Sequence, residues 1–215
     1  MPLTMTDAYP DWDYNGSDVV AQTATKLYAA RQKPCRLSPL IFMTDPARVS
    51  DVIKAAQALP NGAAIIYRHF GKADKYEEAT ALRQITFAKS QQLLIGADPK
   101  LAIAIGADGV HCQRDAAMQA PKLWRQRCPD WIISMAGIKT GDYQGSLTVL
   151  DGLIVSSIFK SQSPSAGTPI GIDGLKGLTK SLPVPIFALG GVNKETAPTL
   201  INSDAAGLAG IGFGI

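Results

Sequence analysis

Two short glycine-rich runs have the spacing that most directly suggests a binding site. Gly190 and Gly191 end one β-rich run, and Gly210, Ile211 and Gly212 belong to another. Backbone N–H groups unobstructed by side chains can close around an anion such as phosphate. The same glycines could instead serve only to form tight turns. The spacing of Gly210 and Gly212 is not a dinucleotide-binding motif, because no helical pattern follows it. The two runs therefore favour a phosphate site.

The elements that would position these glycines form a regular series. Eight β-rich runs alternate with helical patterns, at residues 40–44, 63–70, 93–97, 109–112, 131–136, 152–159, 185–189 and 207–213. They start about 24 residues apart, which accommodates one strand, one helix and two short loops. Such alternation favours a closed barrel over an open doubly wound sheet. The sequence therefore predicts an α/β fold, a single (β/α)8 TIM barrel, with phosphate bound after strands seven and eight.

Helix-start signals support the alternation. Asp45-Pro46 and Asp98-Pro99 each place a capping carboxylate before a proline at the first helical position. Asn193 can cap the helix that follows the seventh strand. We therefore expect helices to begin at all three places.

Two departures from a regular barrel are expected. Residues 137–151 leave room only for a short or absent fifth helix, and no eighth helix follows the last strand. Residues 17–31 form an amphipathic pattern with Ser17 as its cap, so a helix there could cover the wall that the missing helix leaves bare. We divide the chain into an N-terminal extension, 1–36, and a barrel, 37–215.

Composition excludes several classes of protein. Hydrophobic residues make up 46% of the chain and charged residues 18%, which are ordinary globular values. The net charge is +3, without a basic run, so we expect no nucleic-acid partner. No long apolar run or basic, apolar leader is present, so we expect no membrane association and a cytoplasmic location. Cys35, Cys112 and Cys128 lack metal-site or disulfide spacing and are expected to be reduced.

Several motifs together resemble a known family, the thiamine-phosphate synthases and the related TenI-like proteins. The resemblance spans most of residues 40–214 and rests on five elements: Met43-Thr44-Asp45, Arg68, Gly106-Ala107-Asp108-Gly109-Val110-His111, Ile158-Phe159 and Phe187-Ala188-Leu189-Gly190-Gly191-Val192. It implies an enzyme that joins hydroxymethylpyrimidine diphosphate to thiazole phosphate. In that family Mg²⁺ and basic residues hold the departing diphosphate while the thiazole nitrogen captures a pyrimidine cation, chemistry that depends on charge stabilisation.

The resemblance assigns roles to particular residues. It implies that Arg68, Ser161 and Ser163 are catalytic, and a bidentate guanidinium suits a diphosphate. Asp115 matches a magnesium-binding aspartate, in a loop that is one residue shorter than in the family. The thiazole-phosphate site would comprise Gly190, Gly191, Gly210, Ile211 and Gly212.

Other family positions differ in this chain. The Asn-Asp pair after strand three is Gly96-Ala97, which removes a magnesium carboxylate and leaves Asp98 as a helix cap. Phe70 replaces a lysine, for which Lys72 could substitute in the diphosphate site if its loop bends back. Pro164 replaces a second lysine, which in the family follows the pair of hydroxyl residues matched by Ser161 and Ser163. Lys160 is nearby but lies on the other side of this pair. Ala136-Gly137-Ile138-Lys139 replaces the Ser-x-His element after strand five.

The two histidines are expected to be structural. His111 lies in a strand that should be buried, where a hydrogen-bonded role is favoured over a catalytic one. His69 should point away from the barrel lumen if Arg68 points into it.

These observations leave two hypotheses. The chain is either a thiamine-phosphate synthase-like transferase, with Mg²⁺ as cofactor, or a non-catalytic or repurposed relative that binds a phosphorylated small molecule. A different reaction on the same barrel is a third reading, because fold alone does not fix function. In each case we expect a phosphorylated small molecule as partner, and we allow for a homodimer.

Overall fold

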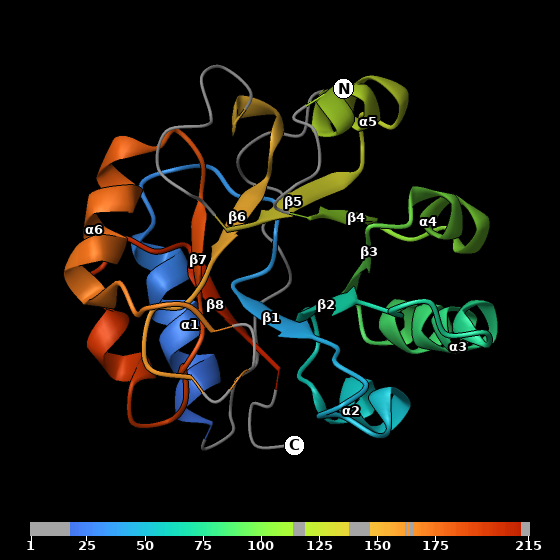
Figure 1. Ribbon diagram of the computed structural model, residues 1–215, viewed down its shortest axis with the longest axis horizontal. Helices are drawn as coiled ribbons and strands as arrows, with labels where there is room; N and C mark the ends of the chain where they lie inside the picture. Colours follow the sequence, from blue (N-terminus) through green and yellow to red (C-terminus); the bar gives the residue numbers. More distant parts are fainter. Residues whose placement is uncertain (1–17, 114–118, 138–146, 162, 164–165, 212–215) are drawn as a thin grey trace.

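The chain forms a closed barrel of parallel strands (Figure 1). The computed structural model describes residues 18–113, 119–137, 147–161, 163 and 166–211. The strands follow chain order, and β8 pairs with β1 to close the barrel. They are β1 (Leu40–Met43), β2 (Ala64–Tyr67), β3 (Gln92–Gly96), β4 (Gly109–Cys112), β5 (Ile132–Ala136), β6 (Gly152–Val155), β7 (Ile186–Leu189) and β8 (Gly207–Gly210). The predicted (β/α)8 fold is confirmed.

Helices surround the barrel. They are α1 (Val19–Ala30), α2 (Val52–Ala58), α3 (Lys75–Ala88), α4 (Pro99–Ile105), α5 (Gln119–Arg127) and α6 (Gly171–Ser181), with the 3-10 helices η1 (Leu147–Val149) and η2 (Ala197–Leu200). Figure 1 shows α2 to α5 along one side and α1 and α6 along the other. Within the described residues, η1 is the only helical segment between β5 and β6, as expected from the short connection.

Three strands end three or four residues earlier than the sequence pattern suggested. The second run was expected to reach Phe70, but β2 ends at Tyr67, and Phe70 has a left-handed φ of 49° that an extended strand cannot contain. The sixth run was expected to reach Phe159 and the eighth Phe213, but β6 ends at Val155 and β8 at Gly210. The residues beyond these ends are therefore free to form the mouth of the barrel.

The predicted helix caps are confirmed in one place and wrong in another. Asp98 caps α4, because its carboxylate accepts the Leu101 N–H at 3.0 Å and Pro99 occupies the first turn. Asp45 instead closes a turn, in which its side chain accepts the Ala47 N–H at 3.0 Å. The cap of α2 is Asp51.

The helix after β7 is reduced to a turn. The Asn193 carboxamide oxygen accepts the N–H groups of Glu195 and Thr196 at 2.9 and 3.0 Å, as a cap should. In the described chain, only η2, which contains Pro198, lies between this cap and β8. A 3-10 turn is short, so the barrel wall beside β8 needs another cover.

Helix α1 provides that cover. Its cap is Asp18, whose carboxylate accepts the N–H groups of Val20 and Ala21 at 2.8 and 3.3 Å. The expected cap, Ser17, lies outside the described residues. The helix packs on η2, β8 and β1, and its inward residues Val20, Ala21, Ala24 and Leu27 are buried.

The core has two apolar layers. Side chains such as Ile41, Ile66, Leu94, Ile154 and Phe187 fill the lumen and are at most 1% exposed. The alternate side chains of the strands pack outward against the helices. A filled lumen is the normal condition of an eight-stranded barrel, so ligands can enter only at its ends.

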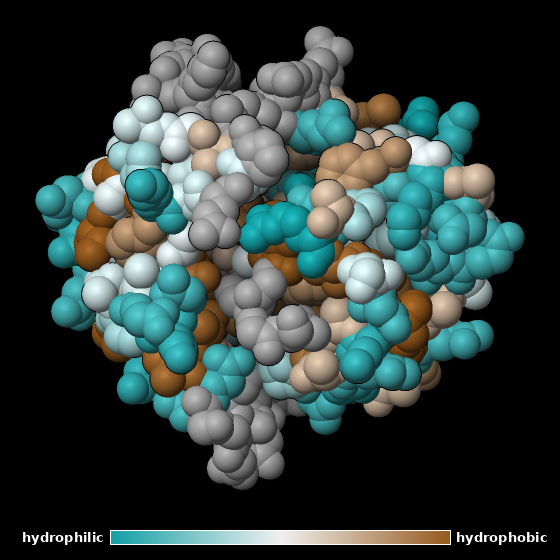
Figure 2. Space-filling model, turned by 60° about the horizontal axis from the view of Figure 1, so that its bottom comes forward, coloured by the Kyte–Doolittle hydropathy of each residue, from teal (hydrophilic) through white to brown (hydrophobic). Residues whose placement is uncertain are grey.

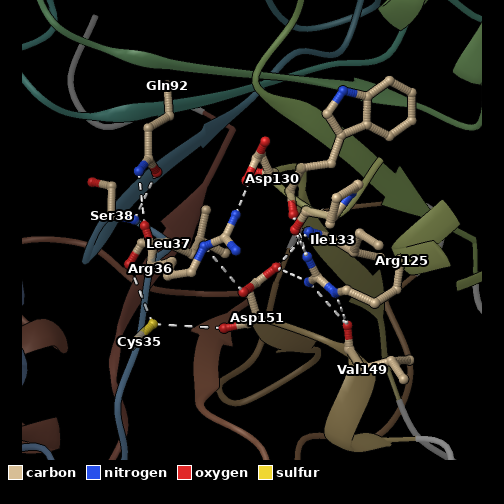
Figure 3. A network of polar contacts seen from close by, with 12 residues as sticks. Cys35, Arg36, Leu37, Ser38, Gln92, Arg125, Asp130, Ile133, Val149 and Asp151 are labelled. Carbon is tan, nitrogen blue, oxygen red and sulfur yellow. Dashed lines mark hydrogen bonds and ion pairs between the residues drawn. The ribbon is translucent and has the colours of Figure 1, made fainter. Parts of the chain in front are cut away.

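The N-terminal end of the barrel is closed by a polar network (Figure 3). The Asp151 carboxylate accepts hydrogen bonds from Arg125 Nη2 at 2.6 Å and from the Ile133 N–H at 2.8 Å. Arg36 Nε lies 3.6 Å from the second oxygen of Asp151, and an Arg36 Nη2 hydrogen bond reaches the main-chain carbonyl of Asp130. The charge of Asp151 is therefore paired with those of Arg125 and Arg36.

The surface provides no sign of a membrane span. None of the helices in the described ranges combines the length and apolarity needed to cross a bilayer. Figure 2, in which the lower side of Figure 1 faces forward, shows hydrophilic residues around much of the periphery and hydrophobic residues nearer the middle. Cys35, Cys112 and Cys128 are free thiols.

Candidate functional site

A cavity of about 730 Å³ lies where the strands end. It is lined by the C-terminal ends of the strands and the loops that follow them, with β5 contributing its last residue, Ala136, as expected for a barrel mouth. The residues that the sequence singled out and the structure brings to this cavity are Arg68, Ser161, Ser163, Gly190, Gly191, Gly210 and Ile211. Asp115 and Gly212 lie outside the described residues.

Arg68 is fixed by the end of β1. Its backbone N–H donates to Thr44 Oγ1 and its Nε donates to the Thr44 carbonyl oxygen, both at 2.7 Å. Nη2 lies 3.9 Å from an Asp45 carboxylate oxygen. This nitrogen is buried and has no hydrogen-bond partner in the described part of the chain. The guanidinium is thus oriented by the hydrogen bond of Nε, whereas Nη2 lacks an acceptor that a bound anion could supply.

The surroundings of Arg68 disfavour its charge. Burial lowers the pKa of Arg68, and although Asp45 raises it, the nearby charge of Arg48 lowers it further. Arg68 Cζ lies over the ring of Phe70, 5.2 Å from the ring centroid. Phe70 stands where the family pattern has a lysine. An anionic ligand would supply the counter-charge that the described residues supply only weakly.

Gly96 creates space for Arg68. A Cβ at Gly96 would lie 3.0 Å from Arg68 Cγ and 3.2 Å from the Tyr67 carbonyl oxygen. The asparagine of the family pattern would therefore crowd the arginine in its present conformation. Glycine at position 96 leaves room for the observed conformation of Arg68.

The glycine pair after β7 has a packing role as well as an exposed backbone. Gly190 and Gly191 have φ values of 93° and 69°, which favour glycine. A Cβ at Gly191 would lie 2.5 Å from the Lys160 carbonyl oxygen and 2.7 Å from Phe159 Cβ. The glycines therefore allow the loop after β6 to lie directly on the loop after β7, and both loops line the cavity.

The loop after β6 brings hydroxyl groups and a cation to the same side of the cavity. Ser156, Ser157, Ser161 and Ser163 all line it, and the Ser163 N–H donates to Ser161 Oγ at 3.3 Å. The exposed Lys160, which precedes the two serines in the sequence, also lines the cavity. This half of the mouth combines a free backbone, hydroxyl groups and one lysine, which are suited to a phosphate.

His111 is a buried, hydrogen-bonded residue at the floor of the cavity. Its Nδ1 lies 2.9 Å from Ser134 Oγ, and both side chains are buried. Burial, reinforced by the charge of Arg68, lowers the pKa of His111 to about 3. The imidazole is therefore neutral at physiological pH and cannot act there as a cation for phosphate.

His69 was expected to point away from the barrel lumen, but it lies at the mouth. It lines the cavity together with Arg68, and its Nε2 lies 3.3 Å from the Asp98 carboxylate. Both residues lie beyond the last residue of β2, where strand alternation no longer dictates which way a side chain points. Lys75 Nζ donates to the same oxygen of Asp98 at 2.7 Å.

Lys72 is not brought to the cavity. Its Nζ donates to both oxygens of Glu78, at 3.0 and 3.1 Å. Glu78 also accepts the hydroxyl proton of Tyr67 at 2.6 Å. The loop does not bend back as the diphosphate role required, because this carboxylate holds the lysine beside α3.

The described donor set does not fit a magnesium site. Gly96 and Ala97 supply no carboxylate, and within the described ranges no group of three or more metal-ligating side chains gathers. Asp98 is already a helix cap. Burial disfavours its ionised form, but hydrogen bonds from Lys75 and the Leu101 N–H and the charges of Lys75 and His69 outweigh burial and lower the pKa of Asp98. Asp115 stays a prediction.

Sequence reasoning overlooked one cation at the mouth. Arg48 follows β1 and lines the cavity. A signal was available, because loops that follow the strands of a barrel meet at one end. The residue was missed because residues 45–51 were expected to begin a helix, whereas they form a turn that reaches the cavity.

Comparison with known proteins identifies the family. A model of the family described as thiamine monophosphate synthase matches residues 40–212. A thiamine-phosphate synthase of Chloroflexus aurantiacus is 31% identical over 163 residues, 74% of this chain and 74% of the relative. One of Alcanivorax borkumensis is 30% identical over 183 residues, 81% of this chain and 83% of the relative.

A solved structure agrees with the sequence matches. The thiamine phosphate pyrophosphorylase of Pyrococcus furiosus superposes with a TM-score of 0.65 at 25% identity, covering 80% of this chain and 85% of its own. The family match, the relatives and the barrel mouth point the same way, and this chain belongs to the thiamine monophosphate synthase family.

Proposed function

We propose that the protein is a thiamine-phosphate synthase-like transferase that joins a pyrimidine diphosphate to a thiazole phosphate at the barrel mouth. The observation that carries the proposal is the division of one cavity into two anion-binding halves. Arg68, with its unsatisfied Nη2, lies on one side, and the Gly190-Gly191 backbone with Ser161 and Ser163 lies on the other. The cavity of about 730 Å³ is in the range of small-molecule sites.

The chemistry requires separation of charge. The bond between the pyrimidine methylene carbon and the diphosphate oxygen breaks, and both electrons leave with the diphosphate. The thiazole nitrogen then donates its lone pair to that carbon. Arg68 stabilises the departing anion, and the glycine backbone and serine hydroxyl groups hold the thiazole phosphate in line. Fixed donors of this kind lower the barrier because they need little reorganisation.

Two parts of the proposal rest on the family resemblance. Asp115 is proposed as a magnesium ligand, and Mg²⁺ would add positive charge beside the diphosphate. The described residues add no second carboxylate, so no step above depends on the ion. A cytosolic location and a homodimer stay predictions, and the free thiols Cys35 and Cys112 accord with the former.

Incubation of the purified chain with both substrates and Mg²⁺ tests the reaction. Thiamine phosphate is the expected product. If none forms while thiazole phosphate still binds, the protein is the non-catalytic or repurposed relative. That alternative is favoured by the replacements at Gly96, Ala97 and Phe70, which remove a carboxylate, an amide and a lysine from the family pattern.

Arg68→Ala tests the division into two subsites. We expect weaker binding of a diphosphate, by roughly 10- to 100-fold, because a charge-assisted pair of hydrogen bonds is lost. Monophosphate binding beside Gly190 and Gly191 should be unchanged. Titration calorimetry with inorganic pyrophosphate and with thiazole phosphate measures both, and an equal loss of the two affinities would contradict two subsites.

A further inference from the structure

Among the described residues, the family's lysine positions supply no second cation to the diphosphate side of the mouth. A diphosphate carries more negative charge than one arginine can balance. Phe70 covers Arg68 at the place of the family's lysine, and Lys72 is held by Glu78. The cation that completes this side must come from elsewhere in the lining of the cavity.

We propose that Arg48 is this second ligand-binding residue, and that Arg48 and Arg68 together clamp the two phosphoryl groups of a diphosphate. The inference rests on the proposed function, because it assigns a further residue to the same subsite. Arg48 lines the cavity with Arg68 and is exposed. Its guanidinium makes no hydrogen bond or ion pair with any other residue that the structure describes.

The turn after β1 explains how Arg48 reaches this position. Asp45 accepts the Arg48 N–H at 2.9 Å and the Val49 N–H at 2.8 Å through its carbonyl oxygen, and the Ala47 N–H at 3.0 Å through its carboxylate. The backbone is therefore fixed while the Arg48 side chain stays unrestrained. The same Asp45 carboxylate lies 3.9 Å from Arg68 Nη2, so one residue organises both arginines.

Electrostatics favour an anion between the two. The positive charge of Arg48 acts on Arg68, whose pKa is lowered mainly by burial and further by this like charge. Asp45 opposes these effects incompletely. Asp98, the described carboxylate that lines the cavity, already pairs with Lys75 at 2.7 Å and lies 3.3 Å from His69 Nε2. Asp45 offers one carboxylate against the two positive charges of Arg48 and Arg68, so a polyanion that contacts both arginines binds more strongly than one that contacts either alone.

Calorimetric titration of the full chain with inorganic pyrophosphate, in the presence of EDTA, tests the clamp. We expect Arg48→Ala to weaken pyrophosphate binding roughly 10- to 100-fold, and to change inorganic phosphate binding less than about threefold. Arg48→Lys should regain part of the loss, because it keeps the charge without the planar fork. Arg127→Ala, which removes an exposed arginine from the end of α5 near the opposite end of the barrel, is the matched control and should bind like the parent.

Three results would overturn the proposal. These are unchanged pyrophosphate binding in Arg48→Ala, an equal loss in Arg127→Ala, or binding by the parent protein only when Mg²⁺ replaces EDTA. Unfolding of the variant is not expected, because Arg48 is exposed, and the melting temperature should stay within about 2 °C. Turnover is a separate readout. If the protein is active but Arg48→Ala leaves its pyrophosphate affinity unchanged, only the clamp is disproved. If the protein is inactive but Arg48→Ala weakens pyrophosphate binding, only the synthase reaction is disproved.

Discussion

The two ends of the barrel use arginine differently. At the N-terminal end, Asp151 lies between Arg125 and Arg36 and also accepts a backbone N–H (Figure 3). Asp108 repeats the arrangement, with Arg83 Nη1 and the Leu93 N–H both at 2.8 Å. At the mouth, Arg68 Nη2 has no hydrogen-bond partner and Arg48 no ion pair among the described residues.

The contrast indicates how charge is divided between stability and binding. Asp108 and Asp151 each directly precede a strand, and each accepts the N–H of a residue in the preceding strand of the barrel. They therefore fix the start of two strand pairs, and an arginine from an outer helix completes each network. The arginines at the mouth stabilise nothing comparable, so their charge is available to a ligand. In such barrels, residues at the N-terminal end usually serve stability, and residues at the C-terminal end usually serve binding and catalysis.

The largest effect is expected from Asp151→Ala. Loss of the carboxylate removes the ion pair with Arg125 and leaves the Ile133 N–H without its partner, in a site where the Asp151 side chain is 10% exposed. Arg125 keeps its hydrogen bonds to the main-chain carbonyls of Pro129, Trp131 and Val149. We expect the free energy of unfolding to fall by about 2–4 kcal/mol in urea titrations, with pyrophosphate affinity within twofold of the parent.

Two matched variants sharpen that measurement. Asp108→Ala should lower the free energy of unfolding by only about 1–2 kcal/mol, because this side chain is 32% exposed. Asp130→Ala should have almost no effect, since Asp130 meets Arg36 through its main-chain carbonyl. A strong effect of Asp151→Ala on pyrophosphate binding would break the proposed division of roles.

Gly191→Ala should affect both stability and binding at the mouth. The φ of 69° and a Cβ 2.5 Å from the Lys160 carbonyl oxygen force a backbone shift. We expect a loss of about 2–3 kcal/mol in unfolding experiments, together with weaker thiazole phosphate binding. Gly71→Ala is the control, because its φ of 81° is similar but no atom lies within 4 Å of the added Cβ. Equal losses in the two variants would show that loop packing is not the cause.

The neutral state of His111 should appear in the pH dependence of stability. The pKa of His111 is about 3 in the folded protein, against about 6.5 for an exposed histidine. Below pH 6.5 the unfolded chain therefore binds a proton that the folded chain does not, so stability falls as pH falls toward 3. The slope is at most about 1.4 kcal/mol per pH unit.

His111→Gln removes the titrating imidazole, so the pH dependence of its stability can be compared with that of the parent protein. Urea unfolding of both proteins at pH 7, 6 and 5 should show a steeper decline in the parent, by about 1–2 kcal/mol over the range. Parallel curves would mean that the pKa of His111 is the same in the folded and unfolded chains, so that His111 would become a cation at the mouth below about pH 6.5.

The smallest effect is expected from Gly96→Ala. The added Cβ would lie 3.0 Å from Arg68 Cγ, so the flexible side chain of Arg68 must shift by a few tenths of an ångström. We expect pyrophosphate affinity to fall only about two- to fivefold, with the melting temperature nearly unchanged. A loss as large as that of Arg68→Ala would show that the exact placement of the guanidinium decides binding.

The sequence by itself determined the barrel and most of the mouth. The repeated alternation of strand and helix patterns can be satisfied by few folds, and the glycine runs must then lie at the ends of β7 and β8. The positions of Arg68, Ser161 and Ser163 at the cavity follow from the same rule, because Arg68 directly follows β2 and the two serines lie in the loop after β6. The cap at Asp98 was readable because Pro99 follows it.

Tertiary structure decided which side chains are free to act. Lys72 looks available in the sequence, but Glu78 holds it, and Asp98, which the sequence presents as a helix cap, is also held by Lys75 and His69. Arg48 looks like part of a helix, yet the turn closed by Asp45 delivers it to the mouth. Each outcome depends on contacts between residues from different loops or helices, or on the local geometry of a turn. The spacing of residue types along one chain does not encode which of two competing partners a charge will take.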